Sequence, residues 1–480
     1  MNPYPANDYA KWRGEALRAW VVGETTRRAD VPPEALMQAV WFHQRLQREK
    51  LIASDGRTVR VLHPGFRNRE PGPDFRDAIV QFGTDTPQSG DVEIDSEPSD
   101  WRAHGHDRNP AFAGVILHVV WRSAGNGERP TLTLESFLDS PLAELAWWHG
   151  EEGERAFPKE LTGRCCAPLR ELSTERLQEL LRQAAFLRMQ SKAAMLHARA
   201  RQAGWEQALW EGLFRGLGYK WNQWPMLRLG ELRSRLCPED SRRPAASVQA
   251  RLLGVGGLLP AELPRRSTAD THIRQLWDEW WRERDSFADC TLPRSAWNFA
   301  GLRPANHPER RLALAAQWLA DAKLPSRIER WATASTGASD DAHRLLEAMQ
   351  VAGDSFWSRH WTLRSAQTKT PQPMLGATRV TDLAMNVVLP WLWVRAWEGR
   401  NEPLRTELER RYFAWPAAED NASLRLARQR LLAGRGGKLF RTGATQQGLL
   451  QVVADFCAHS NALCDECRFP DLVRDWGARP

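Results

Sequence analysis

The chain has 480 residues, and 66 Lys and Arg against 59 Asp and Glu give it a formal net charge of +7 at pH 7. This length favours two to four domains, and a basic excess this diffuse permits nucleic-acid binding without indicating it. The apolar stretches are shorter than the roughly 18–20 residues of a membrane span, and the N-terminal stretch lacks the apolar segment of a signal peptide. We therefore expect a cytoplasmic protein with no membrane partner, whose seven cysteines are thiols or metal ligands.

After an N-terminal extension (1–29), residues 30–140 are predicted to form an α/β domain. Apolar spacing predicts an amphipathic helix over residues 33–50. A short helix capped by Ser99 or Asp100 is expected after the third of the strands that follow. These strands are short, rich in β-branched residues and bounded by Gly, Pro, Asn or Asp, and they are predicted over 58–65, 77–83, 90–95, 114–121 and 129–137.

Beyond about residue 170 the strand patterns give way to helical spacing. We expect a linker (141–172), a helical domain (173–440) and a Cys-containing C-terminal helix and metal-binding segment (441–480). The longest predicted helix covers 173–204 and ends at Gly204. Further helices are predicted over 206–217, 270–285, 308–322, 340–351, 379–398, 403–414, 421–433 and 445–458.

Two carboxylates occupy neighbouring predicted strands: Asp74 precedes one in "GPDF", and Glu93 lies inside the next in "VEID". Metal-assisted phosphodiester hydrolysis needs at least two oxygen ligands that converge on a hard cation. Side chains at these two places can emerge at one end of the same sheet face. The hypothesis is that Asp74 and Glu93 hold Mg²⁺ or Mn²⁺, with the carbonyl of Ile94 as a third ligand. Asp95 should point the same way as Glu93, and such like charges repel unless a cation or proton lies between them.

This element order, with acids at these two places, resembles the PD-(D/E)XK nuclease superfamily, whose core is αβββαβ. The resemblance implies a restriction-endonuclease-like fold and a metal-dependent nuclease, a hydrolase that cleaves DNA or RNA. The superfamily pattern has a lysine two residues after the second acid, where this chain has Asp95, and no lysine occurs between residues 51 and 158. Arg76, Arg102 or a nearby histidine could replace the lysine; Asp95 could itself be a ligand or base; or the site could be degenerate.

The segment "WRAHGHD" contributes His104 and His106 to the same region. Imidazole titrates near neutral pH, so both are candidate ligands or general bases beside Glu93. On a continuous helix residues i and i+2 would not both reach one metal, and the alternative is that the two are surface or helix-capping histidines. His118, within the apolar stretch "VILHVVW", is expected to be a hydrogen-bonded core residue.

Three cysteines, Cys457, Cys464 and Cys467, form C-x6-C-x2-C in "FCAHSNALCDECRF". The C-x2-C pair is a common half-site for tetrahedral zinc. Cys166, Cys165 or His459 could supply the fourth ligand. Some PD-(D/E)XK nucleases bind an iron–sulfur cluster through one distant and three C-terminal cysteines, although there the lone cysteine precedes the nuclease core. The expected cofactor of these cysteines is therefore Zn²⁺ or an iron–sulfur cluster.

Five stretches are similar in sequence and order to an uncharacterised bacterial family, domain of unknown function twenty-eight fifty-one: "HPGFRNREPGPDFRDAIV", "GDVEIDSEPSDWRAHGHD", "VILHVVW", "LRPANHPERR" and "QQGLLQVVADFCAHSNALCDECRF". This resemblance covers most of the chain and implies no established activity; the family tends to carry His where this chain has Asp95. We expect a divalent-metal-dependent nuclease. The alternatives are a catalytically inactive nuclease-fold scaffold that binds nucleic acid or protein, and a metal-dependent hydrolase with another substrate.

Overall fold

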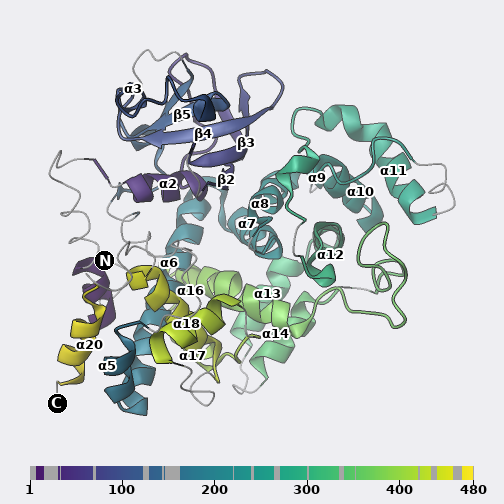
Figure 1. Ribbon diagram of the computed structural model, residues 1–480. Coiled ribbons are helices and arrows are strands. Elements are labelled where there is room, and N and C mark those ends of the chain that lie inside the picture. Colours follow the sequence, from purple (N-terminus) through teal and green to yellow (C-terminus); the bar gives the residue numbers. More distant parts are fainter. Residues whose placement is uncertain are drawn as a thin grey trace.

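An N-terminal mixed sheet is followed by a mostly helical region in the computed structural model of the chain (Figure 1). The sheet lies at one end of the molecule, and the helices extend below and beside it in this view. The structure describes residues 7–15, 31–32, 34–68, 72–122, 129–142, 145, 163–219, 221–238, 243–263, 271–299, 302–334, 340–351, 353–419, 422–433, 441–457 and 467–478. Within these ranges, each helix is too short or too polar to cross a membrane.

The sheet region begins with α2 (Glu34–Phe42), which ends well before the predicted residue 50. A short helix, α3 (Asp100–Ala103), lies between the fourth and fifth strands, as predicted, and is followed by a 3-10 turn (Pro110–Phe112). Ser99 is the N-cap residue of α3, although its side chain makes no capping hydrogen bond. The six strands are β1 (Val59–His63), β2 (Phe66–Arg67), β3 (Phe75–Phe82), β4 (Gln88–Asp95), β5 (Val115–Val120) and β6 (Thr131–Thr133). The strand predictions are confirmed in place, although β6 is shorter than predicted and β2 was not predicted.

The strand order is β1-β3-β4-β5-β6, with β2 paired to β3. β3 is antiparallel to β1 and to β4. A short turn joins β3 to β4 and allows antiparallel pairing, whereas the longer crossover through α3 allows β4 and β5 to pair in parallel. Phe75 of β3 pairs with Val92 of β4, so Asp74 comes to lie beside Glu93. The register then shifts by one residue at Asp77, which has a φ of 56°. Such a bulge bends the strand and is frequent next to functional sites.

One face of the sheet packs on α2. Met37, Val40 and Trp41 of α2 share a buried cluster with Val80 of β3 and Ile94 of β4. On the other side, Leu62 and Ile79 belong to the main cluster of the helical region. The sheet is therefore covered on both sides by packed apolar residues, and the polar ends of its strands are left to form a site.

The helical region is built around α6 (Thr174–Ala203), whose N-terminus is capped by the Ser173 hydroxyl and which packs along α19 (Gly443–Val452). A π-helical turn over Ala384–Val388 accommodates Pro390, which has no N–H to donate to the preceding turn. The other helices are α5 (Cys166–Glu171), α7 (Trp205–Leu217), α8 (Gln223–Glu231), α9 (Arg233–Leu236), α10 (Ala245–Val255), α11 (Thr271–Glu283), α12 (Pro308–Asp321), α13 (Leu324–Thr333), α14 (Asp341–Met349), α15 (Ala377–Leu383), α16 (Leu389–Glu398), α17 (Glu402–Ala414), α18 (Ala422–Leu432) and α20 (Phe469–Gly477). The predicted helices are present, and α5, α8, α9, α10, α13 and α20 were not predicted.

Residues 8–15 form a helix that packs beside α20, so a segment near the start of the chain contacts one near its end (Figure 1). Trp12 contacts Phe469 and Trp476, with ring centroids 6.3 Å and 6.1 Å apart. Buried Asp455 pairs with Arg13 (Nε–Oδ1, 2.9 Å). Tyr9 and Trp12 therefore belong to the same buried cluster as Phe456, Phe469 and Trp476.

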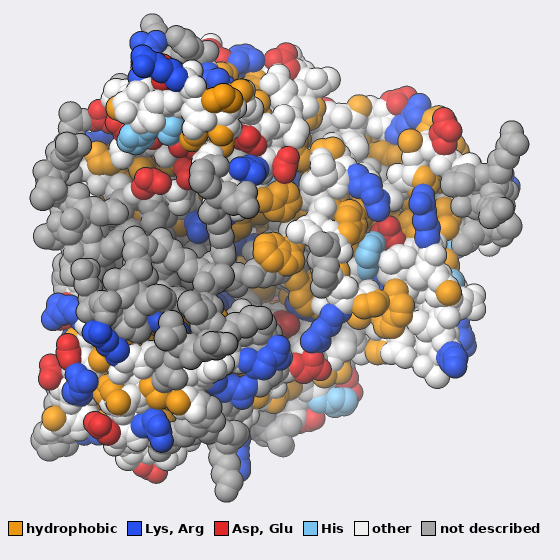
Figure 2. Space-filling model, viewed as in Figure 1, with side chains coloured by type: hydrophobic (Ala, Val, Ile, Leu, Met, Phe, Trp, Pro, Cys, Tyr) orange, Lys and Arg blue, Asp and Glu red, His pale blue; other side chains and the backbone are white. Residues whose placement is uncertain are grey.

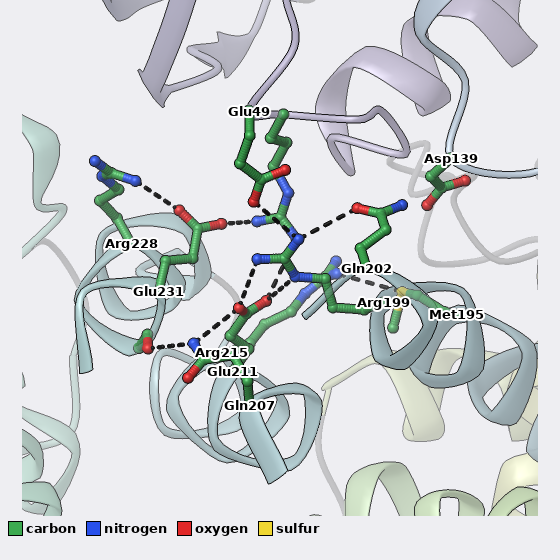
Figure 3. Close-up of polar contacts among 12 residues, drawn as sticks. Glu49, Asp139, Met195, Arg199, Gln202, Gln207, Glu211, Arg215, Arg228 and Glu231 are labelled. Atoms are coloured by element: carbon green, nitrogen blue, oxygen red, sulfur yellow. Dashed lines mark hydrogen bonds and ion pairs between the residues drawn. The ribbon is translucent and has the colours of Figure 1, made fainter. Parts of the chain in front are cut away.

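Buried ion pairs connect the loop after α2 to the helical region (Figure 3). Glu211 of α7 accepts hydrogen bonds from Nε and Nη2 of Arg199 (2.8 Å and 2.9 Å) and lies 3.4 Å from Nη2 of Arg48. Arg48 also pairs with Glu231 of α8, and Arg199 pairs with Glu49 (3.0 Å). Glu49 is exposed, but the charges of Arg48, Arg199 and Glu211 are enclosed. Enclosed charges stay favourable only while their partners are present, so the network holds the sheet region on the helices.

Candidate functional site

Asp74 and Glu93 lie next to each other, as the neighbouring-strand argument predicts. The backbone N–H of Asp74 donates to Oε2 of Glu93 (2.9 Å), and the backbone N–H of Ile94 donates to Oδ2 of Asp74 (3.1 Å). Gln38 of α2 donates from Nε2 to the other oxygen of Asp74 (2.9 Å). Sequence reasoning missed Gln38; its only signal is that it is a polar residue within an amphipathic helix that covers these strands. The two acids are thus held by main-chain contacts between β3 and β4.

The electrostatic environment opposes ionisation of both carboxyls. Burial raises the pKa of Asp74 to about 7, and the negative charges of Glu34 and Asp95 add to this effect, while Arg67 lowers it. Burial, then the charge of Asp74, raises the pKa of Glu93 to about 9. The pair therefore holds a proton near neutral pH, unless a cation beside it offsets the repulsion.

Asp95, two residues after Glu93, is buried among three histidines. His104 Nδ1 lies 3.1 Å from Asp95 Oδ1, and His118 Nε2 lies 3.0 Å from Oδ2. His106 Nδ1 lies 3.7 Å from Asp95 Oδ2 and 3.6 Å from Glu93 Oε1. The prediction that His118 is a hydrogen-bonded core residue is confirmed. Because both acids approach His106, Glu93 and Asp95 emerge on the same side of β4, as predicted.

The end of α3 brings His104 and His106 to the same place. The helix stops at Ala103, His104 is its C-cap, and Gly105 has a φ of 74°, so the chain reverses before His106. The two imidazole centroids are 5.4 Å apart. The helix-capping alternative is thus correct for His104, yet its ring still contacts Asp95. The argument that residues i and i+2 diverge applies only within a continuous helix, and here the helix has ended.

Two aromatic residues that sequence reasoning missed hold the ring of His106. It stacks on Phe112 at a centroid distance of 4.0 Å and meets the edge of Trp101 at 5.3 Å. Its side chain is 11% exposed, and this burial lowers the pKa of His106, so the ring is neutral near pH 7. His104, by contrast, is 56% exposed. In the space-filling view, histidine side chains appear beside acidic ones at the surface of the sheet region (Figure 2).

The other replacements considered for the lysine lie toward the surface. Arg102 and Arg76 are both exposed. A Cβ on Gly72, two residues before Asp74, would lie 3.3 Å from Nη2 of Arg76, so this guanidinium is close to the turn that carries Asp74. The side chains that contact Asp95 are instead the imidazoles of His104 and His118.

The cysteine predictions are answered only in part. Cys165 and Cys457 belong to one buried cluster, against which Cys467 packs, and Cys166 is buried in α5. Cys464 and His459 lie outside the described residues. Within the described ranges, one group of residues could hold a metal ion: Asp95, His104 and His106, whose ligand atoms lie within 4.8 Å of one another. A zinc or iron–sulfur site at the cysteines stays a prediction.

Comparison with known proteins places this site in a family. No curated protein and no solved structure matches the chain. A family model described as "Protein of unknown function (DUF2851)" matches residues 34–421, which include the sheet, all five predicted catalytic residues and most of the helical region. We conclude that the chain belongs to this family of proteins of unknown function.

Proposed function

We propose that the protein is a divalent-metal-dependent nuclease, in which Asp74 and Glu93 hold Mg²⁺ or Mn²⁺. The observation that carries the proposal is the pair formed by buried Glu93 of β4 and half-buried Asp74 just before β3, with raised pKa values and a direct Asp74 N–H to Glu93 contact. Carboxylate oxygens are the ligands that these cations prefer, and a bound cation offsets the repulsion that raises both pKa values. The element order and the position of both acids resemble the PD-(D/E)XK pattern.

The surrounding residues fit hydrolysis of a phosphodiester. A divalent ion, when bound, polarises the phosphate and lowers the pKa of a coordinated water. His104 is exposed enough to meet solvent and contacts Asp95 through Nδ1, so these two residues can orient the attacking water. Arg76, exposed beside the turn before Asp74, can contact a substrate phosphate.

One observation favours the second candidate, an inactive scaffold that binds nucleic acid or protein. Both carboxylate oxygens of Asp74 already accept hydrogen bonds, from Gln38 and from the backbone of Ile94. An ionised carboxylate oxygen can accept more than one such contact, so these bonds leave room for a cation. They would, however, suffice for a purely structural role.

A cleavage assay separates the two candidates. Single- and double-stranded DNA and RNA are incubated with the protein in Mg²⁺, Mn²⁺ or chelator, and compared with Asp74→Asn, Glu93→Gln and the control Asp85→Asn, which changes an exposed acid on the β3–β4 turn. The nuclease proposal predicts metal-dependent cleavage that both site variants reduce at least about a hundredfold and that the control retains. Nucleic-acid binding without cleavage in any metal, or cleavage unchanged by Asp74→Asn, would establish the scaffold.

A further inference from the structure

We propose a second metal position at this site, formed by Asp95, His104 and His106, which takes a transition-metal ion such as Zn²⁺ or Mn²⁺ in preference to Mg²⁺. A catalytic role for this ion rests on the proposed function, but binding of the ion can be measured independently of any cleavage activity. The position differs from the Asp74–Glu93 pair in its ligand chemistry, because imidazole nitrogen suits zinc and iron, whereas Mg²⁺ prefers oxygen.

The distances around His106 fit ligands of one ion better than hydrogen bonds. Ligands about 2.1 Å from a metal lie about 3.0 Å apart in octahedral and about 3.4 Å apart in tetrahedral geometry. His104 Nδ1 and Asp95 Oδ1 are 3.1 Å apart, which suits either arrangement. His106 Nδ1 is 3.6–3.7 Å from the carboxylate oxygens of Glu93 and Asp95, too far for a hydrogen bond but within a small adjustment of ligand spacing.

Hydrogen bonding alone leaves this site incomplete. Nδ1 of His104 and Nε2 of His118 each have Asp95 as a hydrogen-bond partner. Nδ1 of His106, by contrast, is shielded from solvent and has no hydrogen-bond partner within the part of the chain described. A buried polar atom without a partner is costly and rare, and an ion at this point would use its lone pair.

The ligands are also held in place before any ion binds. Phe112 stacks on the His106 ring, and Trp101 packs against its edge. His118, buried on β5, contacts Asp95 Oδ2 and so fixes the orientation of that carboxylate. Supporting contacts of this type commonly orient metal ligands, and they reduce the entropy that binding must overcome.

Glu93 connects the two positions. Its Oε2 accepts the N–H of Asp74, while its Oε1 faces Nδ1 of His106. One carboxylate that faces both ligand sets is suited to bridge two ions. Two-metal sites of this kind stabilise both the attacking and the leaving oxygen of a phosphodiester, which fits the proposed substrate class.

Metal titrations of the full chain test the inference. Co²⁺ is added to the metal-free protein and followed by visible absorption, which reports nitrogen ligands, and bound Mn²⁺ is counted by electron paramagnetic resonance. The variants are His106→Phe, which preserves the stack on Phe112, and His104→Ala at an exposed position; His343→Ala changes an exposed histidine of the helical region as control. Circular dichroism and the unfolding midpoint verify the fold of each variant.

We expect two Mn²⁺ per wild-type chain and a Co²⁺ absorption band that excess Mg²⁺ does not abolish. His106→Phe and His104→Ala should each weaken Co²⁺ binding at least about tenfold and leave one Mn²⁺, while the control keeps both ions. Asp74→Asn should retain the Co²⁺ band. A single Mn²⁺ per wild-type chain, or a Co²⁺ band unchanged in both histidine variants, would overturn the inference even if the protein is an active nuclease. Two bound ions that depend on the histidines, without cleavage of nucleic acid, would uphold the inference and refute the proposed nuclease.

Discussion

Glu93→Gln should stabilise the metal-free protein while it abolishes metal binding at the Asp74–Glu93 pair. Glutamine has nearly the same shape as glutamate, and its amide oxygen can still accept the N–H of Asp74. The substitution removes a carboxyl that must be protonated in order to stay beside Asp74 and Asp95 in a buried place. A carboxylate kept for metal binding destabilises the empty site, whereas a carboxylate kept for structure stabilises the fold, so the sign of the effect separates the two roles.

The size of the effect follows from the raised pKa. The ordinary pKa of 4.5 rises to about 9 in the folded chain. One pKa unit corresponds to about 1.4 kcal/mol, so at about pH 7.5 the cost of keeping this group neutral has an upper limit of about 4 kcal/mol. Relaxation of the site and burial of the amide offset part of this gain, and we expect Glu93→Gln to raise the free energy of unfolding by about 1–2 kcal/mol.

The pH dependence has a definite sign. Because the folded pKa is raised, the penalty is absent below the unfolded pKa, near 4.5, and grows as the pH rises toward the folded value of about 9. The wild-type protein in chelator should therefore lose stability between about pH 5 and about pH 8, and Glu93→Gln should lose less. The measurement is urea unfolding at both pH values, with and without Mn²⁺.

The control for this experiment is Glu135→Gln, which changes a surface acid paired with Arg122 and should shift stability by less than about 1 kcal/mol. Mn²⁺ should stabilise the wild type and the control more than Glu93→Gln, which retains only the Asp95, His104 and His106 position. The reasoning is refuted if Glu93→Gln lowers the free energy of unfolding by more than about 1 kcal/mol in chelator, or if Mn²⁺ stabilises it as much as the wild type.

Two further predictions concern the helical region. Glu211→Gln removes the buried negative charge that pairs with Arg199 and should cost about 3 kcal/mol in urea unfolding, whereas Glu419→Gln, at an exposed ion pair, should cost less than about 0.5 kcal/mol. Equal effects would show that the network of Figure 3 does not hold the regions together. Gly254→Ala places a Cβ 2.1 Å from the Trp280 ring, so we expect the thermal unfolding midpoint to fall by several degrees, and an unchanged midpoint would contradict the close packing of α10 on α11.

The strands and the adjacency of the two acids could be predicted because they depend on local signals. Alternating β-branched residues and turn residues define β3 and β4, and antiparallel pairing then brings Asp74 beside Glu93. The end of α2 could not be predicted, because the apolar spacing continues beyond Phe42. There the chain turns at Gln44, with a φ of 48°, and Leu46 bridges to Leu138. That long-range contact has no signal in the local sequence.

The histidine arrangement was predictable in its members but not in its geometry. The sequence identifies His104 and His106 as candidates, but their convergence depends on the helix end at Ala103 and on the left-handed conformation of Gly105. The contact of His118 with Asp95 depends on the parallel pairing of β4 and β5, which are separated in the chain by α3. Tertiary contacts of this kind set which polar side chains meet.

Anomalous diffraction from crystals grown with Mn²⁺ tests most directly the claim that Asp74 and Glu93 share a cation. The account predicts an anomalous peak about 2.2 Å from a carboxylate oxygen of each residue, which disappears in Glu93→Gln. Crystals that bind Mn²⁺ only elsewhere, with Asp74 still bonded solely to Gln38 and Ile94, would contradict it.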